Sequence, residues 1–156
     1  MAQRHFENQQ QRVLFIDDEA FISGTLAQHL RILGWDVTFV SDINELFKEI
    51  RKSQKFDILI FDIMMPIPEM ENKYVVFSQR EIEEMDGGMN TGVVLAKKIW
   101  TEVKNDIPIL FLSAKRPESV SQLPTSFRFD YIRKPVLAET LEIKLKVMLN
   151  HKSPRL

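Results

Sequence analysis

The chain has 156 residues, a formal net charge of −1 and 44% hydrophobic residues, which is typical of one globular domain with its own core. The near-neutral charge gives no basis for bulk attraction to nucleic acid or to an anionic membrane. The absence of cysteine excludes disulfide bonds, thiolate metal ligands and a cysteine nucleophile. No apolar run approaches the roughly 18 residues of a membrane span, so we expect a cytoplasmic protein.

Short apolar runs alternate with segments of helical periodicity. The polar residues 1–11 are expected to form a flexible N-terminus, and strands are predicted at 13–16, 35–40, 56–61, 107–112 and 129–132. Helices are predicted at 20–33, ended by Gly34, from Ser41 or Asp42 to Ile50, at 92–103 and from Leu137 or Ala138 to Leu149. This alternation indicates an α/β fold: a doubly wound, five-stranded parallel sheet with helices on both faces.

Two segments break this rhythm. The connection over 67–84 is long for a compact α/β domain and contains either a short strand (YVVF) or a helical turn (SQREIEEM). Between Ser113 and Tyr131, Pro124 leaves space for only a turn or two of helix. We therefore expect one domain over 12–150 with an insertion at 67–84, a shortened fourth helix and a C-terminal tail at 151–156.

The residues whose side chains could take part in a reaction lie at the ends of the predicted strands. Asp17 and Asp18 end the first strand, Asp62 ends the third, Ser113 ends the fourth, and Lys134 follows the fifth. Because parallel strands end at one edge of a sheet, these side chains can converge there. Three carboxylates need a cation among them, and an oxygen-only ligand set favours Mg²⁺. A carboxylate beside Mg²⁺ can attack phosphorus and form an acyl phosphate.

Four segments, FIDDEA, FDIMMP, ILFLSA and DYIRKP, carry a family resemblance. In their order and spacing they resemble the signatures of the bacterial two-component response-regulator receiver domain, a flavodoxin-like fold, over roughly residues 12–150. Because only a short tail follows the last helix, we expect the stand-alone, single-domain type.

The resemblance implies a role for each site residue. Asp62 would be the phosphoacceptor, and Mg²⁺ would be bound by Asp17, Asp18, Asp62 and the backbone carbonyl of Met64. Lys134 and Ser113 would contact the phosphoryl group, and Ser113 and Tyr131 would form the switch. Pro135 would follow a cis peptide bond.

The resemblance also implies partners. A histidine kinase or a histidine phosphotransfer protein would supply the phosphoryl group, and an unidentified downstream protein would receive the signal. We expect no direct DNA binding, no membrane contact, and no enzyme activity beyond self-catalysed phosphotransfer and slow autodephosphorylation.

Other interpretations stay open. Taken singly, Asp17 and Asp18 could cap a helix, and Ser113 could cap the short fourth helix. A phosphohydrolase of the haloacid-dehalogenase type uses similar residues, although its nucleophile usually ends the first strand. A receiver-like scaffold that acts without phosphorylation is the third interpretation. The insertion separates DIMMP from MDGG, where the family has a short connection, and is either a functional cover of the site or a tolerated loop.

Overall fold

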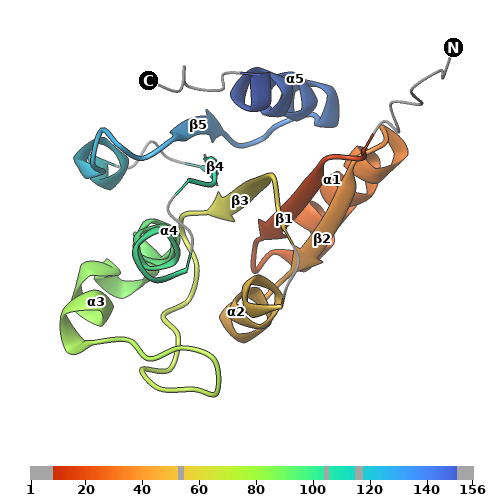
Figure 1. The fold of residues 1–156 in the computed structure, drawn as a ribbon. Helices are drawn as coiled ribbons and strands as arrows, with labels where there is room; N and C mark the ends of the chain where they lie inside the picture. The colour runs from red at the N-terminus through yellow and green to blue at the C-terminus, as the bar shows by residue number, and fades with distance from the viewer. Residues whose placement is uncertain (1–8, 53–54, 104–105, 115–117, 151–156) are drawn as a thin grey trace, which may run out of the picture.

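The computed structural model describes residues 9–52, 55–103, 106–114 and 118–150. Residues 1–8 of the predicted flexible N-terminus and all of the predicted tail 151–156 lie outside the described residues. Within the described ranges, the chain folds around one central sheet (Figure 1).

The sheet has five parallel strands in the order β2-β1-β3-β4-β5. The strands are β1 (Arg12–Ile16), β2 (Asp36–Val40), β3 (Ile58–Asp62), β4 (Ile109–Ser113) and β5 (Phe129–Arg133). Every residue of β3 and β4 is buried, as expected for central strands that are covered on both faces. The predicted doubly wound parallel sheet is confirmed.

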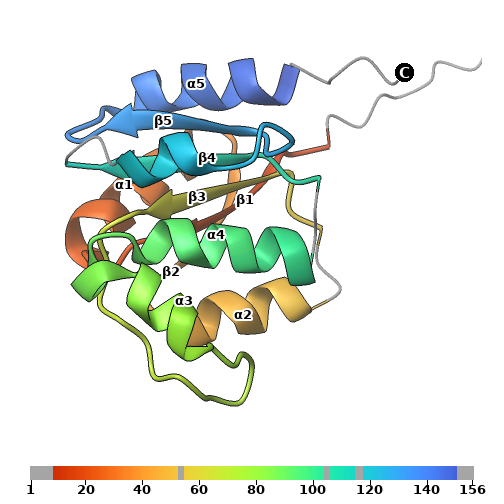
Figure 2. The same ribbon diagram turned by 90° about the vertical axis from the view of Figure 1, so that its left-hand side faces the viewer.

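Helices cover both faces of the sheet (Figures 1 and 2). One face packs against α1 (Ala20–Ile32) and α5 (Ala138–Asn150), and the other packs against α2 (Ile43–Arg51) and α4 (Thr91–Glu102). Asp42, not Ser41, caps α2, because its side chain accepts a hydrogen bond of 2.9 Å from the amide of Glu45. Gly34 follows α1 with a φ of 101°, so the predicted glycine stop is confirmed.

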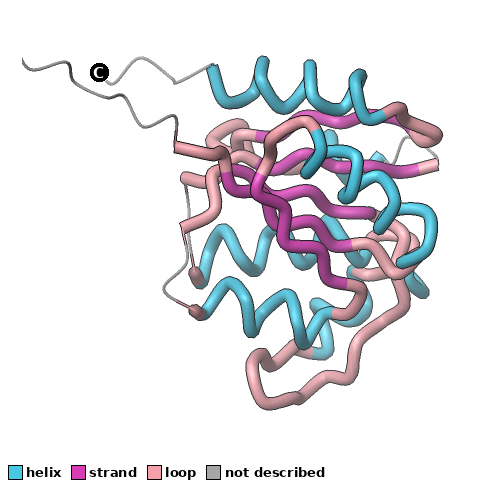
Figure 3. Tube along the Cα trace, turned by 90° about the vertical axis from the view of Figure 1, so that its right-hand side faces the viewer, coloured by secondary structure: helices cyan, strands magenta, loops and turns pink. Residues whose placement is uncertain are grey.

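The connection from β3 to α4 is folded and carries core residues. It contains α3 (Gln79–Glu84) and the 3₁₀ turn η1 (Asp86–Gly88), whereas the alternative strand at 74–77 makes only an isolated bridge between Glu71 and Val76. Val75, Phe77 and Met85 are buried, and the ring of Phe77 meets that of Phe47 on α2 edge-to-face at 6.2 Å. Figure 3 shows the loop part of this connection extending past the helices on that face.

The helix that covers the sheet begins at Thr91. Residues 86–88 of the MDGG segment form η1, and the connection runs to Asn90, close to the helix start predicted at 92. Further along the chain, the 3₁₀ helix η2 (Glu118–Gln122) stands where a full fourth helix was expected in the family, so the predicted shortening is confirmed.

Candidate functional site

Three carboxylates meet at the carboxyl edge of the sheet. Asp17 and Asp18 directly follow β1, and Asp62 is the last residue of the neighbouring strand β3. One carboxylate oxygen of each lies within 4.8 Å of the others. This spacing suits one shared cation, and Asp18 is the exposed member of the group.

Lys134 reaches the carboxylates from the loop after β5. Its Nζ lies 2.6 Å from Oδ2 of Asp17 and 3.6 Å from Oδ1 of Asp62. Its backbone N–H donates to the carbonyl of Ser113 at 2.9 Å, and the peptide bond between Lys134 and Pro135 is cis, as predicted. The structure thus brings together side chains from the ends of three strands that are far apart in sequence.

Burial controls the electrostatics of this cluster. Asp17 is 0% and Asp62 is 4% exposed. Burial, and then the neighbouring charges of Asp17 and Asp18, raise the pKa of Asp62 to about 7, against the lowering effects of Lys134 and the Met64 amide. For Lys134, burial alone would lower the pKa, but the hydrogen bond to Asp17 and the charge of Asp62 raise it above its ordinary value.

Asp17 is held by partners that the sequence did not indicate. The hydroxyl of Ser23 on α1 donates to Oδ2 of Asp17 at 2.5 Å, and the amide of Glu19 donates to Oδ1 at 2.9 Å. Ser23 is buried in the first turn of α1. The sequence held one signal for this contact: Ser23 is a small hydroxyl residue soon after the two aspartates, in the helix that follows them.

The remaining predicted residues surround the cluster. Ser113 ends β4 and is buried, and its carbonyl accepts a hydrogen bond of 3.4 Å from the half-buried Tyr131 hydroxyl. Met64 lies two residues past Asp62, and its amide is the backbone donor to the Asp62 carboxylate. Met64 and Ser113 therefore lie close to Asp62, Tyr131 contacts Ser113, and the functional roles of all three remain predictions.

Thr91 and Gly92, at the start of α4, contact the backbone at and after Asp62. Neither contact was expected from the sequence. A Cβ atom on Gly92 would lie 2.0 Å from the carbonyl oxygen of Asp62, so only glycine fits there. The hydroxyl of the fully buried Thr91 donates to the carbonyl of Met65 at 2.7 Å. The start of α4 consequently fixes the backbone that follows Asp62.

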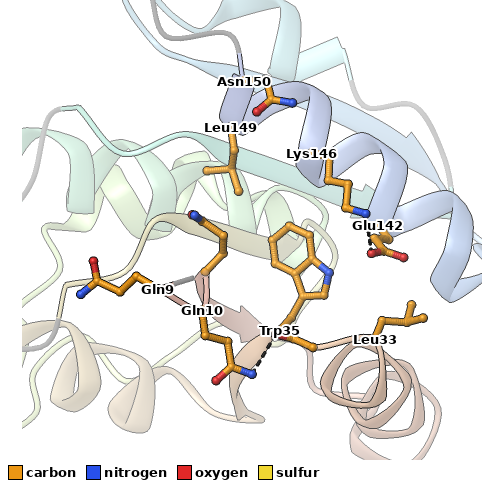
Figure 4. A pocket seen from close by; sticks show the side chains of 10 residues that line it. Gln9, Gln10, Leu33, Trp35, Glu142, Lys146, Leu149 and Asn150 are labelled. Atoms are coloured by element: carbon orange, nitrogen blue, oxygen red, sulfur yellow. Dashed lines mark hydrogen bonds and ion pairs between the residues drawn. The ribbon is translucent and has the colours of Figure 1, made fainter. Parts of the chain in front are cut away.

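A hollow of about 540 Å³ lies at the opposite edge of the sheet (Figure 4). Its walls come from the residues before β1, from Trp35 before β2 and from the end of α5, where Lys146 pairs with Glu142 at 2.9 Å. None of the clustered acids lines it, so it is separate from the candidate site.

No family profile matches the chain. Solved structures do match it: the receiver domain protein from Methanospirillum hungatei (TM-score 0.64, 22% identity, 90% of this chain and 94% of that one) and CheY4 from Vibrio cholerae (TM-score 0.64, 20% identity, 89% and 98%). The chain therefore has the fold of response-regulator receiver domains. The receiver domain of the hybrid histidine kinase CckA is also similar, with a TM-score of 0.59, 22% identity and coverage of 88% and 98%.

Two curated relatives of the chain are named as probable transcriptional regulators. The probable transcriptional regulator ycf27 of Porphyridium aerugineum is 30% identical over 90% of this chain and 49% of its own length. The probable regulatory protein TcrX of Mycobacterium tuberculosis is 26% identical over 94% and 53%. The chain spans about half the length of these relatives, so their activities as whole proteins are not transferred to it. No helix within the described residues has the length and apolar character needed to cross a bilayer.

Proposed function

We propose that this receiver domain accepts a phosphoryl group from a phosphohistidine onto Asp62, with Mg²⁺, and signals through protein contacts. The observation that carries the proposal is the meeting of Asp17, Asp18 and Asp62 with the ammonium of Lys134 at one edge of the sheet.

The residues present fit a divalent cation. Three carboxylates lie together in a partly buried site, and burial with mutual repulsion raises the pKa of Asp62 to about 7 even with Lys134 nearby, so a further cation would favour the ionised cluster. Asp17, Asp18, Asp62 and the carbonyl of Met64 would hold Mg²⁺. When bound, Mg²⁺ would neutralise charge on the phosphoryl oxygens.

The chain's own groups have separate tasks in the transfer. A carboxylate oxygen of Asp62 attacks phosphorus as the P–N bond of the phosphohistidine breaks, and the imidazole leaves. Lys134, already 3.6 Å from Asp62, neutralises one phosphoryl oxygen, and the Ser113 hydroxyl binds another. Ser113 and Tyr131, joined through the Ser113 carbonyl, would then report the arrival of the phosphoryl group.

Asp17 is a poor candidate for the nucleophile of a dehalogenase-type hydrolase. Its two oxygens accept hydrogen bonds from Ser23, Glu19 and Lys134, and its side chain is fully buried. This supports Asp62 as the acceptor. The donor would be a histidine kinase or a histidine phosphotransfer protein in the cytoplasm, and the output would go to another protein.

The test is intact-mass measurement after incubation with Mg²⁺ and acetyl phosphate or a phosphorylated kinase. One phosphoryl adduct is expected on the wild type, and none on Asp62→Asn. Chelation of Mg²⁺ should abolish the adduct. An unmodified wild type with both donors, or equal modification of Asp62→Asn, would refute the proposal.

A further inference from the structure

A second hollow, of about 220 Å³, lies beside Asp18. It is formed between the loop that joins β2 to α2 and the first part of the connection after β3. Most of its wall is apolar, and this part comes from Ile16, Ile43, Met65, Pro66, Ile67 and Pro68. The connection after β3 therefore supplies one side of this hollow, and its residues from Ile67 on belong to the insertion.

The rim of the hollow is acidic. Asp18, Asp42 and Glu69 all line it and are all exposed, and among the described residues no lysine, arginine or histidine lines it. One oxygen of Asp42 accepts the capping hydrogen bond from α2, which leaves its charge in place. An apolar wall with an acidic rim is complementary to a side chain that has an apolar stem and a cationic end.

The walls of the hollow are fixed by hydrogen bonds. At one end of the segment, the amide of Met65 donates to the carbonyl of Gly88 at 3.1 Å, and Thr91 donates to the carbonyl of Met65. At the other end, Nε of Arg51 on α2 donates to the carbonyl of Tyr74 at 2.8 Å. Because both ends are tied to the folded domain, binding requires little ordering of the segment.

We propose that this hollow binds a lysine or arginine side chain of a protein partner. The stem lies against Ile43 and Ile67, and the cation faces the carboxylates of Asp18, Asp42 and Glu69. The proposal rests on the proposed function only in that the partner is a protein. Since Asp18 also belongs to the acid cluster, a bound partner contacts the edge of the phosphorylation site.

The absence of native cysteine permits a direct test. A single cysteine is introduced as Asn44→Cys, at an exposed position on the rim, in the Asp62→Asn background. The variant is equilibrated with disulfides of an alkyl ammonium, a neutral alkyl and an alkyl carboxylate of equal length, and capture is read by intact mass. We expect the ammonium to be captured about two- to fivefold more than the neutral compound, and the carboxylate less.

Matched controls separate the hollow from general charge effects. Gln28→Cys, exposed on α1, should show no such preference. Added to Asn44→Cys, Glu69→Gln should reduce the ammonium preference, whereas Glu71→Gln, on the same segment but outside the lining, should leave it unchanged. Equal capture of the ammonium, neutral and carboxylate compounds would overturn the proposal. Equal effects of Glu69→Gln and Glu71→Gln would also overturn it.

A competition experiment addresses the kind of partner. A short peptide with lysine between two leucines should reduce ammonium capture, and the same peptide with glutamate should not. Competition by a free alkylamine but not by the lysine peptide would overturn the assignment to a protein partner. Because Asp62→Asn cannot form the acyl phosphate, these results are independent of whether Asp62 accepts a phosphoryl group.

Discussion

The ammonium of Lys98 on α4 lies 2.8 Å from a carboxylate oxygen of Glu81 on α3. The Lys98 side chain is only 5% exposed, it also pairs with Glu102 at 3.0 Å, and it lies over the ring of Phe77 at 5.2 Å from the centroid. Ser78 and Glu81 form a capping box that fixes the start of α3. The inserted segment is thus joined to the sheet-covering helix by a largely buried ion pair.

Removing the charge of Lys98 should destabilise the domain. Lys98→Met keeps most of the buried stem but leaves Glu81 without its partner, and we expect a loss of about 1–3 kcal/mol in the free energy of unfolding. Urea denaturation provides the measurement. The neighbouring Lys97→Met, where the lysine side chain is 40% exposed and its Nζ lies 4.0 Å from Glu84, should change the value by less than about 0.5 kcal/mol. Equal effects would contradict a structural role for Lys98.

The same ion pair should make stability depend on acid pH. Burial would raise the pKa of Glu81, but the hydrogen bond from Lys98 lowers it below the ordinary value of a glutamate. A lowered folded-state pKa gives stability that is present above the unfolded pKa and is lost as pH falls through the folded pKa. The difference in unfolding free energy between wild type and Glu81→Gln should therefore shrink below about pH 4. A difference that stays constant down to acid unfolding would be evidence against this.

Asp62 should have the opposite pH dependence when Mg²⁺ is absent. Its folded pKa of about 7 is above its unfolded value, so the stability that it contributes is full below the unfolded pKa and is lost as pH rises through about 7. Asp62→Asn should accordingly gain stability relative to wild type between pH 5 and 8, by about 1–3 kcal/mol. Saturating Mg²⁺ should reduce this gain, because a bound cation stabilises the ionised wild-type cluster. Thermal or urea unfolding with and without chelator measures both effects.

Two glycines offer a matched pair of substitutions. At Gly92 an added methyl group would lie 2.0 Å from the Asp62 carbonyl, so Gly92→Ala should cost several kcal/mol, about 3 or more, or prevent folding. At Gly24 on α1 the nearest atom would be 3.9 Å away, in Phe39, and Gly24→Ala should stabilise by about 0.5–1 kcal/mol. Comparable unfolding midpoints for the two variants would show that α4 does not pack so closely on the acceptor strand.

Local patterns in the sequence were sufficient to predict the sheet and the helices that surround it. The apolar segments at 56–61 and 107–112 indicated buried strands, and Ser41 or Asp42 and Gly34 marked helix ends, because these signals depend only on short-range chemistry. The carboxylates at the ends of two strands could likewise be placed at one edge of the sheet from topology alone. The shortened fourth helix followed from Pro124.

Contacts between distant residues decided the rest. Whether the segment after β3 is a loose cover or part of the core depended on Phe77 meeting Phe47 and on Lys98 meeting Glu81, which no local pattern encodes. Ser23, Thr91 and Gly92 contact the residues at the strand ends only because packing brings their helices there. The sequence by itself determined the fold and the acidic set around Asp62. Only the tertiary structure decided how that set is supported and which hollow adjoins it, because both depend on distances across the chain.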